Sequence, residues 1–315
     1  MSWQLHGDQL NVAVLAGGVS AERPISLASG RCVRQALVEA GREADLWDPA
    51  EVDLSSIPWS RYDACFIALH GGAGEDGRVQ QRLKLLKVPY TGSGPAASRL
   101  AMSKSASKER FLQHGISTPE YALLAAAGDA RDVAAKTRQL GFPLVFKPDS
   151  QGSSLGLSVA HTAADVPGCL EGCRPLDRFV VAERFIRGRE FTVAVLDRRP
   201  LPLIEIITDG GLFDYQAKYE SPSTRYVFDV DLPPEHTDKL YQSATRAADA
   251  LDTRGLVRVD LILDPKGDAW VLEVNTVPGL TGKSLAPRAA QRAGIDMPRL
   301  CDRLVRDCLR CGVTT

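Results

Sequence analysis

The sequence contains no apolar run long enough to cross a membrane. Such a span needs about 20 consecutive apolar residues, and no run in these 315 residues approaches that length. Residues 1–8 also lack the apolar core of a secretory signal peptide. From these two absences we expect a cytoplasmic protein that has no membrane partner.

A basic cluster and a disulfide framework are also missing. The net charge is -1 and both signs are well mixed, so no segment is suited to following a nucleic-acid backbone. The seven cysteines, an odd number scattered through a chain of this size, are expected to be reduced thiols. The partners that remain are small molecules, and we expect no nucleic acid among them.

Two common nucleotide-binding sequences are absent as well. The first apolar run ends at Gly17-Gly18 without the dinucleotide fingerprint G-x-G-x-x-G. Around Lys147 the small residues, 151–156, follow the lysine, whereas the glycines of a Walker A loop precede it. This loop would still allow backbone amides to approach phosphate closely, with Lys147 supplying a point charge. A plain Gly-Ser hairpin turn would have a similar sequence, so the loop alone leaves both readings open.

Two apolar runs near the C-terminus predict a β-hairpin. They cover residues 255–264 and 269–275 and flank the turn signal 265–268. Because side chains two apart on a strand point the same way, Arg258 shares a face with Asp260. By the same rule, the two polar residues of the second run share a face.

The polar residues of this hairpin are Asp260, Glu273 and Asn275, with Arg258 beside them. Oxygen donors without His or Cys suit Mg²⁺, which usually bridges to substrate phosphates. The alternative is the solvated face of an ordinary hairpin. Charges buried unpaired in apolar strands are costly, which favours a metal site and therefore a bound nucleotide.

The first third of the chain alternates strands with helices. Apolar strands are predicted at 12–16 and 64–69 and another strand at 43–47, which together indicate a parallel sheet. Ligands bind beyond the carboxyl ends of such strands, where the loops 17–22 and 70–77 lie. We predict a Rossmann-like substrate domain over residues 1–100.

The sequence pattern of alternating strands and helices changes near residue 100. Residues 98–114 read as helical, and new strands are predicted at 143–147 and 179–185. We predict a small central α+β domain at 101–187 and a C-terminal α+β domain at 188–315 that contains the hairpin.

The order and spacing of these motifs resemble the ATP-grasp superfamily and, at closer range, its D-alanine:D-alanine ligases. The motifs that carry the resemblance are Ala16–Arg23, Ala68–Gly71, Gly74–Gly77, Pro89–Gly94, Gly188–Val193, Asp214–Tyr219, Arg258–Asp260 and Glu273–Gly279. The resemblance implies an α/β ATP-grasp fold and the ATP-dependent ligation of two D-alanine molecules through a D-alanyl phosphate, for peptidoglycan precursor synthesis. It also implies two Mg²⁺ ions, which Mn²⁺ could replace, and a homodimer.

The resemblance also assigns site residues. For ATP these are Lys104, Lys147, Ser153, Glu183, Glu190 and Lys218, and for the metal Asp260, Glu273 and Asn275. Around the amino acids they are Glu22, His70, Ser153, Lys218, Tyr219, Arg258, Gly279 and Ser284. Glu22 is implied to bind the first ammonium and Ser284 the second carboxylate. Arg258 and the Gly279 amide are implied to stabilise the oxyanion.

Residues 210–231 resemble the family's mobile ω-loop, which would exclude water from the acyl phosphate. Tyr219 in this loop favours D-alanine as the second substrate. The chain departs from the usual pattern at 227–229 and at Lys283, where a smaller residue or His is common. These departures leave open a ligase that takes D-serine or D-lactate second. A third reading is a non-catalytic nucleotide-binding protein, against which the presence of Arg258 and the metal ligands argues.

Overall fold

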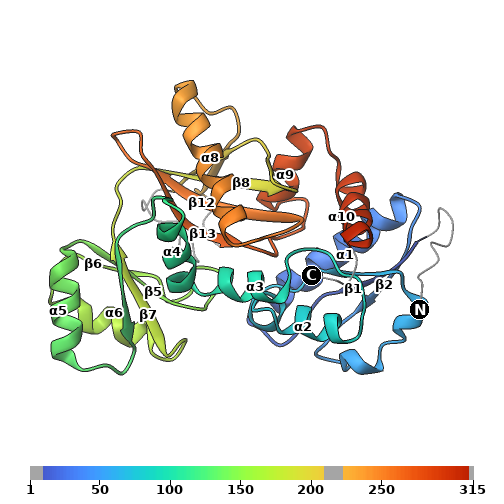
Figure 1. The fold of residues 1–315 in the computed structure, drawn as a ribbon, viewed down its shortest axis with the longest axis horizontal. Coiled ribbons are helices and arrows are strands. Elements are labelled where there is room, and N and C mark those ends of the chain that lie inside the picture. The colour runs from blue at the N-terminus through green and yellow to red at the C-terminus, as the bar shows by residue number, and fades with distance from the viewer. Residues whose placement is uncertain (1–9, 209–222, 312–315) are drawn as a thin grey trace.

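The computed structural model describes residues 10–208 and 223–311, and within these residues the chain forms three β-sheets. The first sheet is parallel and the other two are antiparallel. Figure 1 shows the parallel sheet at one end of the molecule, the small antiparallel sheet at the other end, and the largest sheet between them. No helix in the described part of the chain is long and apolar enough to span a membrane.

The parallel sheet has the strand order β2-β1-β3, as expected from the alternation of strands and helices. Its strands are β1 (Asn11–Leu15), β2 (Glu43–Trp47) and β3 (Ala64–Ile67), with helices α1 (Arg23–Glu39), α2 (Arg78–Leu85) and α3 (Pro95–Met102). The side chains of β1 from Val12 onward are buried, because this apolar strand is central in the sheet. Because β1 and β3 are parallel, the loops that follow them leave the same edge of the sheet.

The small sheet has the order β4-β7-β5-β6. Its elements are α4 (Lys104–Gln113), β4 (Tyr121–Ala125), α5 (Ala130–Leu140), β5 (Leu144–Pro148), β6 (Ser158–Ala160), α6 (Val166–Cys173) and β7 (Phe179–Arg184). Phe146 and Val180 pack with side chains of α5 and α6 in one core. Side chains alternate along a strand, so Lys147 and Glu183 lie on the opposite face of the sheet.

The region 98–114, which was predicted to be helical, forms two helices. It is interrupted at Ser103, where α3 ends and α4 begins. The Ser103 hydroxyl accepts a hydrogen bond from the Ala106 amide at 3.3 Å, which makes it the N-cap of α4. Lys104 is consequently the first residue of α4.

The largest sheet has the order β11-β10-β8-β12-β13, and β9 pairs with β8. Its elements are β8 (Arg189–Leu196), β9 (Arg199–Pro200), β10 (Ile204–Ile207), β11 (Arg225–Val227), α8 (Pro234–Ala250), β12 (Leu256–Leu263), β13 (Ala269–Asn275), α9 (Leu285–Arg292) and α10 (Met297–Cys311). The hairpin β12–β13 confirms the sequence prediction. Helix α8 packs on this sheet.

The last helix returns to the start of the chain. Leu300 and Leu304 of α10 belong to the same core as Val12 and Val14 of β1. Figure 1 shows α10 beside α1, so the two ends of the described chain pack together. The domain limits near residues 100 and 187 stay predictions.

Candidate active site

Two cavities meet beside the hairpin β12–β13. The first, of about 510 Å³, opens between the loops after β1 and β3 and the segment after β13. The second, of about 320 Å³, lies against the free face of the small sheet. Lys104, Gln151 and Glu273 line both cavities, so a ligand in one would be adjacent to a ligand in the other.

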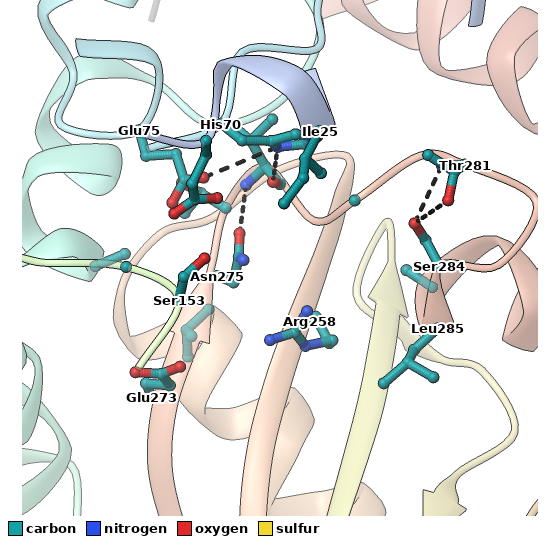
Figure 2. Close-up of a pocket in the computed structure, with 18 of the residues that line it drawn as sticks. Ile25, His70, Glu75, Ser153, Arg258, Glu273, Asn275, Thr281, Ser284 and Leu285 are labelled. Atoms are coloured by element: carbon teal, nitrogen blue, oxygen red, sulfur yellow. Dashed lines mark hydrogen bonds and ion pairs between the residues drawn. The ribbon is translucent and has the colours of Figure 1, made fainter. Parts of the chain in front are cut away.

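The first cavity brings together residues from distant parts of the sequence. Those predicted around the amino acids that line it are Glu22, His70, Ser153, Arg258, Gly279 and Ser284. Figure 2 shows His70 and Glu75 on one side of this cavity and Ser284 with Thr281 on the other, with Arg258 between them. The carboxyl group of Glu75 thus lies across the cavity from the hydroxyl groups of Thr281 and Ser284, with the Arg258 guanidinium between them.

The second cavity has a charged side and an apolar side. Its charged residues include Lys104, Lys147, Glu183, Glu190, Asp260 and Glu273. Its apolar residues include Val145, Leu155, Leu157, Phe185, Ile186, Ile262 and Leu272. The apolar residues were not predicted as site residues, because in the sequence they resemble any other core-forming side chains. Such a cavity suits a flat nucleobase with phosphates attached.

Lys218 and Tyr219 lie outside the described residues, as do residues 210–222 of the predicted ω-loop. The described end of the predicted loop includes β11, whose Tyr226 lines the first cavity. Phe228 lies 4.7 Å beneath the guanidinium of Arg288 on α9. The unusual sequence at 227–229 therefore fixes the end of this loop against α9 through cation–π contacts.

Asp260 and Glu273 lie directly opposite each other on β12 and β13, and Arg258 lies opposite Asn275. Asp260 is in the middle of its strand, and only 3% of its surface is exposed. Its Oδ1 accepts hydrogen bonds from Thr192 Oγ1 at 2.7 Å and Arg258 Nε at 2.9 Å, and its Oδ2 accepts one from Arg258 Nη2 at 2.8 Å. The polar residues converge because the antiparallel register pairs them across the two strands, and not because they lie where the strands end.

The chemistry of this group fits a magnesium ion. No cluster of three or more His, Cys, Asp or Glu suited to a metal occurs in the part of the chain that the structure describes. The candidate set instead contains two carboxylates and the Asn275 amide, whose oxygen already accepts a hydrogen bond from the Val277 amide at 2.9 Å. A carboxylate or amide oxygen has a second lone pair. Mg²⁺ usually takes its remaining ligands from water and phosphate, so a set this small is sufficient.

Glu183 lies between two lysines on the floor of the second cavity. Lys147 Nζ donates to its Oε1 at 2.6 Å, and Lys108 Nζ is 2.7 Å from its Oε2. Burial alone would raise the pKa of Glu183, but the two ammonium groups bring it below the ordinary value. Burial lowers the pKa of Lys108 to about 8. The cluster of Lys108, Lys147 and Glu183 itself combines two cations with one anion, and Lys147 within it lines the cavity where phosphates would bind.

Lys108 was not predicted as a site residue. The available signal was its spacing, because it follows Lys104 by four residues on the same helix and therefore lies on the same face. Its side chain is completely buried and also donates to Thr118 Oγ1 at 2.8 Å.

Glu75 is a second residue that the sequence analysis missed, although it lies within the motif Gly74–Gly77. Its Oε1 accepts a hydrogen bond from the Gly71 amide at 3.0 Å and lies 4.0 Å from His70 Nδ1. Burial, and then the nearby charge of Glu22, raise the pKa of Glu75 to about 8. Burial lowers the pKa of His70 to about 4, so this imidazole is neutral at pH 7.

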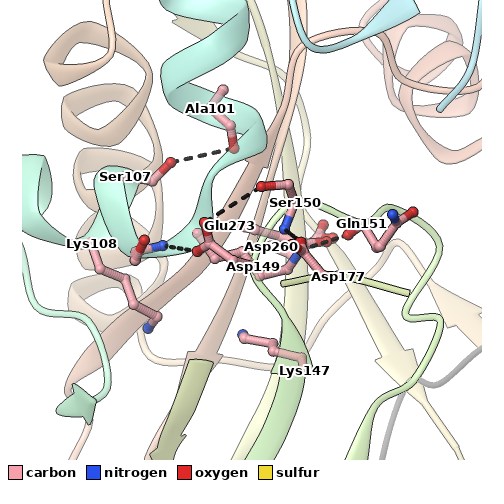
Figure 3. Close-up of polar contacts among 12 residues, drawn as sticks. Ala101, Ser107, Lys108, Lys147, Asp149, Ser150, Gln151, Asp177, Asp260 and Glu273 are labelled. Carbon is pink, nitrogen blue, oxygen red and sulfur yellow. Dashed lines mark hydrogen bonds and ion pairs between the residues drawn. The ribbon is translucent and has the colours of Figure 1, made fainter. Parts of the chain in front are cut away.

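The loop after β5 joins the two cavities. Lys104 Nζ donates to the Gln151 carbonyl at 2.6 Å, and Asp149 accepts from the Ser105 amide at 2.7 Å. Figure 3 shows Asp149, Ser150 and Gln151 in this loop, and Gln151 lines the second cavity together with Asp260 and Glu273. A Cβ atom on Gly152 would lie 2.9 Å from Glu22 Oε1, so only glycine allows this approach without displacement.

Comparisons with known proteins identify the family. Residues 111–306 match the family model described as D-ala D-ala ligase C-terminus, and residues 55–93 match D-ala D-ala ligase N-terminus. The chain is 45% identical to the D-alanine–D-alanine ligase of Bordetella pertussis over 92% of each chain. It is also 45% identical to that of Aromatoleum aromaticum, over 94% of this chain and 95% of the relative.

Solved structures agree with the sequence relatives. The D-alanine–D-alanine ligase of Bacillus anthracis complexed with ATP superposes with a TM-score of 0.84 and 31% identity, covering 96% of this chain and 98% of that one. A second structure of the Bacillus anthracis ligase gives a TM-score of 0.85 at 33% identity, with the same coverage. The predicted ATP-grasp fold is confirmed, and the chain belongs to the D-alanine–D-alanine ligase family.

Proposed function

We propose that this protein joins two D-alanine molecules into D-alanyl-D-alanine, using ATP and passing through D-alanyl phosphate. The observation that carries the proposal is the common wall of the two cavities, formed by Lys104, Gln151 and Glu273. A γ-phosphoryl group at this wall would reach a carboxylate in the first cavity. Family membership supports the same chemistry.

In the first step, a carboxylate oxygen of one D-alanine attacks the γ-phosphorus of ATP, and ADP leaves. We assign Lys104 and Lys147 to the phosphates and Glu190 and Glu183 to the adenosine. Lys147 donates a hydrogen bond to Glu183 at 2.6 Å, which would hold its ammonium group in the second cavity, where the phosphates would bind. Glu22, whose carboxylate lies against Gly71 and Gly152, would bind the ammonium of the first D-alanine.

In the second step, the amine of the other D-alanine attacks the acyl carbonyl carbon and the tetrahedral intermediate collapses. The peptide bond forms as phosphate leaves, carrying the proton that the nitrogen loses. Arg258 and the Gly279 amide would stabilise the negative oxygen of this intermediate. Ser284 precedes helix α9, so its hydroxyl and the first amides of that helix would hold the second carboxylate. Ser153, His70 and the predicted lid residues Lys218 and Tyr219 would complete the site.

Asp260, Glu273 and Asn275 would hold Mg²⁺, which we propose as two ions that Mn²⁺ could replace. When bound, the metal would offset negative charge on the transferring phosphoryl group. Removing divalent cations with EDTA is expected to abolish phosphate release, and added Mg²⁺ to restore it.

Phosphate release with Mg-ATP tests the proposal, with L-alanine, D-serine and D-lactate each offered beside D-alanine and the products identified by mass. Release with D-alanine alone, giving D-alanyl-D-alanine, supports it. Release only with a mixed pair would move the assignment to a different second substrate. Bound ATP without release in any mixture would indicate a non-catalytic nucleotide-binding protein.

We also propose that the protein is a homodimer that acts in the cytoplasm, where ATP is available. Light scattering should then give a mass near twice 34.1 kDa. A mass near 34.1 kDa would refute the dimer, and recovery of the protein in a non-cytoplasmic cell fraction would refute the location.

A further inference from the structure

Ser29 is a completely buried residue on helix α1 that contacts two distant parts of the chain. Its Oγ lies 2.8 Å from His70 Nε2, in the loop after β3, and 3.2 Å from the Leu280 amide, in the segment after β13. A hydroxyl has one proton to donate and lone pairs to accept. Ser29 is therefore placed to join both segments to α1.

The direction of each hydrogen bond follows from the neighbours. His70 Nδ1 lies 3.1 Å from the Val277 carbonyl oxygen, which can only accept, so Nδ1 carries the proton of the neutral ring. Nε2 then accepts from the Ser29 hydroxyl, and Ser29 Oγ accepts from the Leu280 amide. The bonds run from Leu280 through Ser29 and His70 back to Val277.

Val277 and Leu280, the first and last partners in this series of hydrogen bonds, flank Gly279 in the sequence. We assign the Gly279 amide to the oxyanion. A Cβ atom on Gly279 would lie 2.7 Å from Ser284 Oγ, so glycine lets the backbone pass close to the Ser284 hydroxyl here. Helix α1 begins directly after Glu22, the residue assigned to the first ammonium. One helix thus fixes the position of groups on both sides of the first cavity.

We propose that Ser29 is a positioning residue for the ligation, which holds residues 277–280 against helix α1 through His70 and so sets the place of the Gly279 amide. Ser29 does not line either cavity, so it acts through other residues. The proposal rests on the proposed function for its catalytic consequence. Its structural part, the anchoring of residues 277–280, stands independently of the substrate.

Ser26 provides a matched control. It is also completely buried on α1, and its hydroxyl accepts from the Gly17 amide and donates to the Ala68 carbonyl, each at 2.8 Å. Both of these partners belong to the first third of the chain. Ser26→Ala therefore removes a comparable hydroxyl without releasing residues 277–280.

The experiment compares Ser29→Ala, Ser29→Cys and Ser26→Ala in the full-length chain. Cysteine replaces the hydroxyl with a larger thiol and so leaves no cavity, but it weakens both hydrogen bonds, and it therefore separates the loss of bonding from the creation of a cavity. We expect kcat to fall about 10- to 100-fold in both Ser29 variants, because small misplacements of catalytic groups are costly. The KM for ATP should change less than about twofold, and Ser26→Ala should lose far less kcat.

Hydrogen–deuterium exchange of peptides spanning 277–284 provides a readout that does not depend on activity. Exchange there should accelerate in both Ser29 variants and stay as in the wild type in Ser26→Ala. Unchanged exchange, or a kcat loss no greater than that of Ser26→Ala, would overturn the proposal. A wild-type protein that makes no D-alanyl-D-alanine would refute the proposed function, whereas the exchange result would still decide the anchoring.

Discussion

Replacing Arg258 with methionine should reduce stability as well as activity. Arg258 donates two hydrogen bonds to Asp260, and the two side chains are only 15% and 5% exposed. Removing one partner of such a pair typically costs about 3–5 kcal/mol, because the other charge remains buried. The bond from Thr192 to Asp260 remains and should offset part of this, which leaves an expected loss of about 2–3 kcal/mol in the free energy of unfolding.

The assay is urea unfolding of Arg258→Met, Asp260→Asn and the double variant. If the cost comes from the stranded Asp260 charge, the double variant should be less destabilised than the sum of the single variants, by at least about 1 kcal/mol. Arg198→Met is the control, since Arg198 and Asp249 form an exposed pair at 3.5 Å, which should contribute less than about 0.5 kcal/mol. Additive effects of Arg258 and Asp260 would refute the reasoning.

Activity should respond differently from stability in this series. Arg258→Met is expected to lower kcat by about 100-fold or more through loss of oxyanion stabilisation. Adding Asp260→Asn should restore stability in part but should not restore kcat. Recovery of activity in the double variant would show that Arg258 acts only by balancing the charge of Asp260.

Three further predictions concern the two cavities. The pKa of Glu75 in the folded protein, about 8, exceeds its ordinary 4.5, so the folded state binds the extra proton and wild-type stability should fall as pH rises between these values. The whole fall is at most about 5 kcal/mol. Glu75→Gln should remove most of it, which urea unfolding across this pH range would measure; an unaltered dependence of stability on pH would contradict the prediction. Gly152→Ala should raise the KM for the first D-alanine, because the added Cβ would displace the Glu22 carboxylate. Gly282→Ala is the control and should leave this KM unchanged, since a Cβ there meets nothing within 4 Å. Equal effects of the two substitutions would argue against the contact between Gly152 and Glu22. Lys108→Met should weaken ADP binding, measured by calorimetry, about tenfold or more without changing the KM for D-alanine. Unchanged ADP affinity would show that Lys108 does not contribute to nucleotide binding.

The local chemistry of the site could be predicted from the sequence because it depends on short-range patterns. Period-two alternation placed Arg258 with Asp260 on one face of a strand, and a turn signal paired that strand with the next. Alternating strands and helices predicted the parallel sheet and placed the loop containing Glu22 at its carboxyl edge. Ser103, by contrast, lies within a sequence that reads as helical throughout. The break between two helices at Ser103, where its side chain caps the second helix, was therefore not predicted.

The tertiary structure alone decided which distant residues meet and how burial changes them. The sequence determined the fold class, the hairpin and the residue types available for phosphate, metal and amino acid. Nothing in the sequence near Ser29 indicates contact with Leu280, because the two are brought together by packing of separate elements. The charges of Lys108 and Glu75 likewise depend on surroundings assembled from remote segments, since desolvation and neighbouring charges set a pKa.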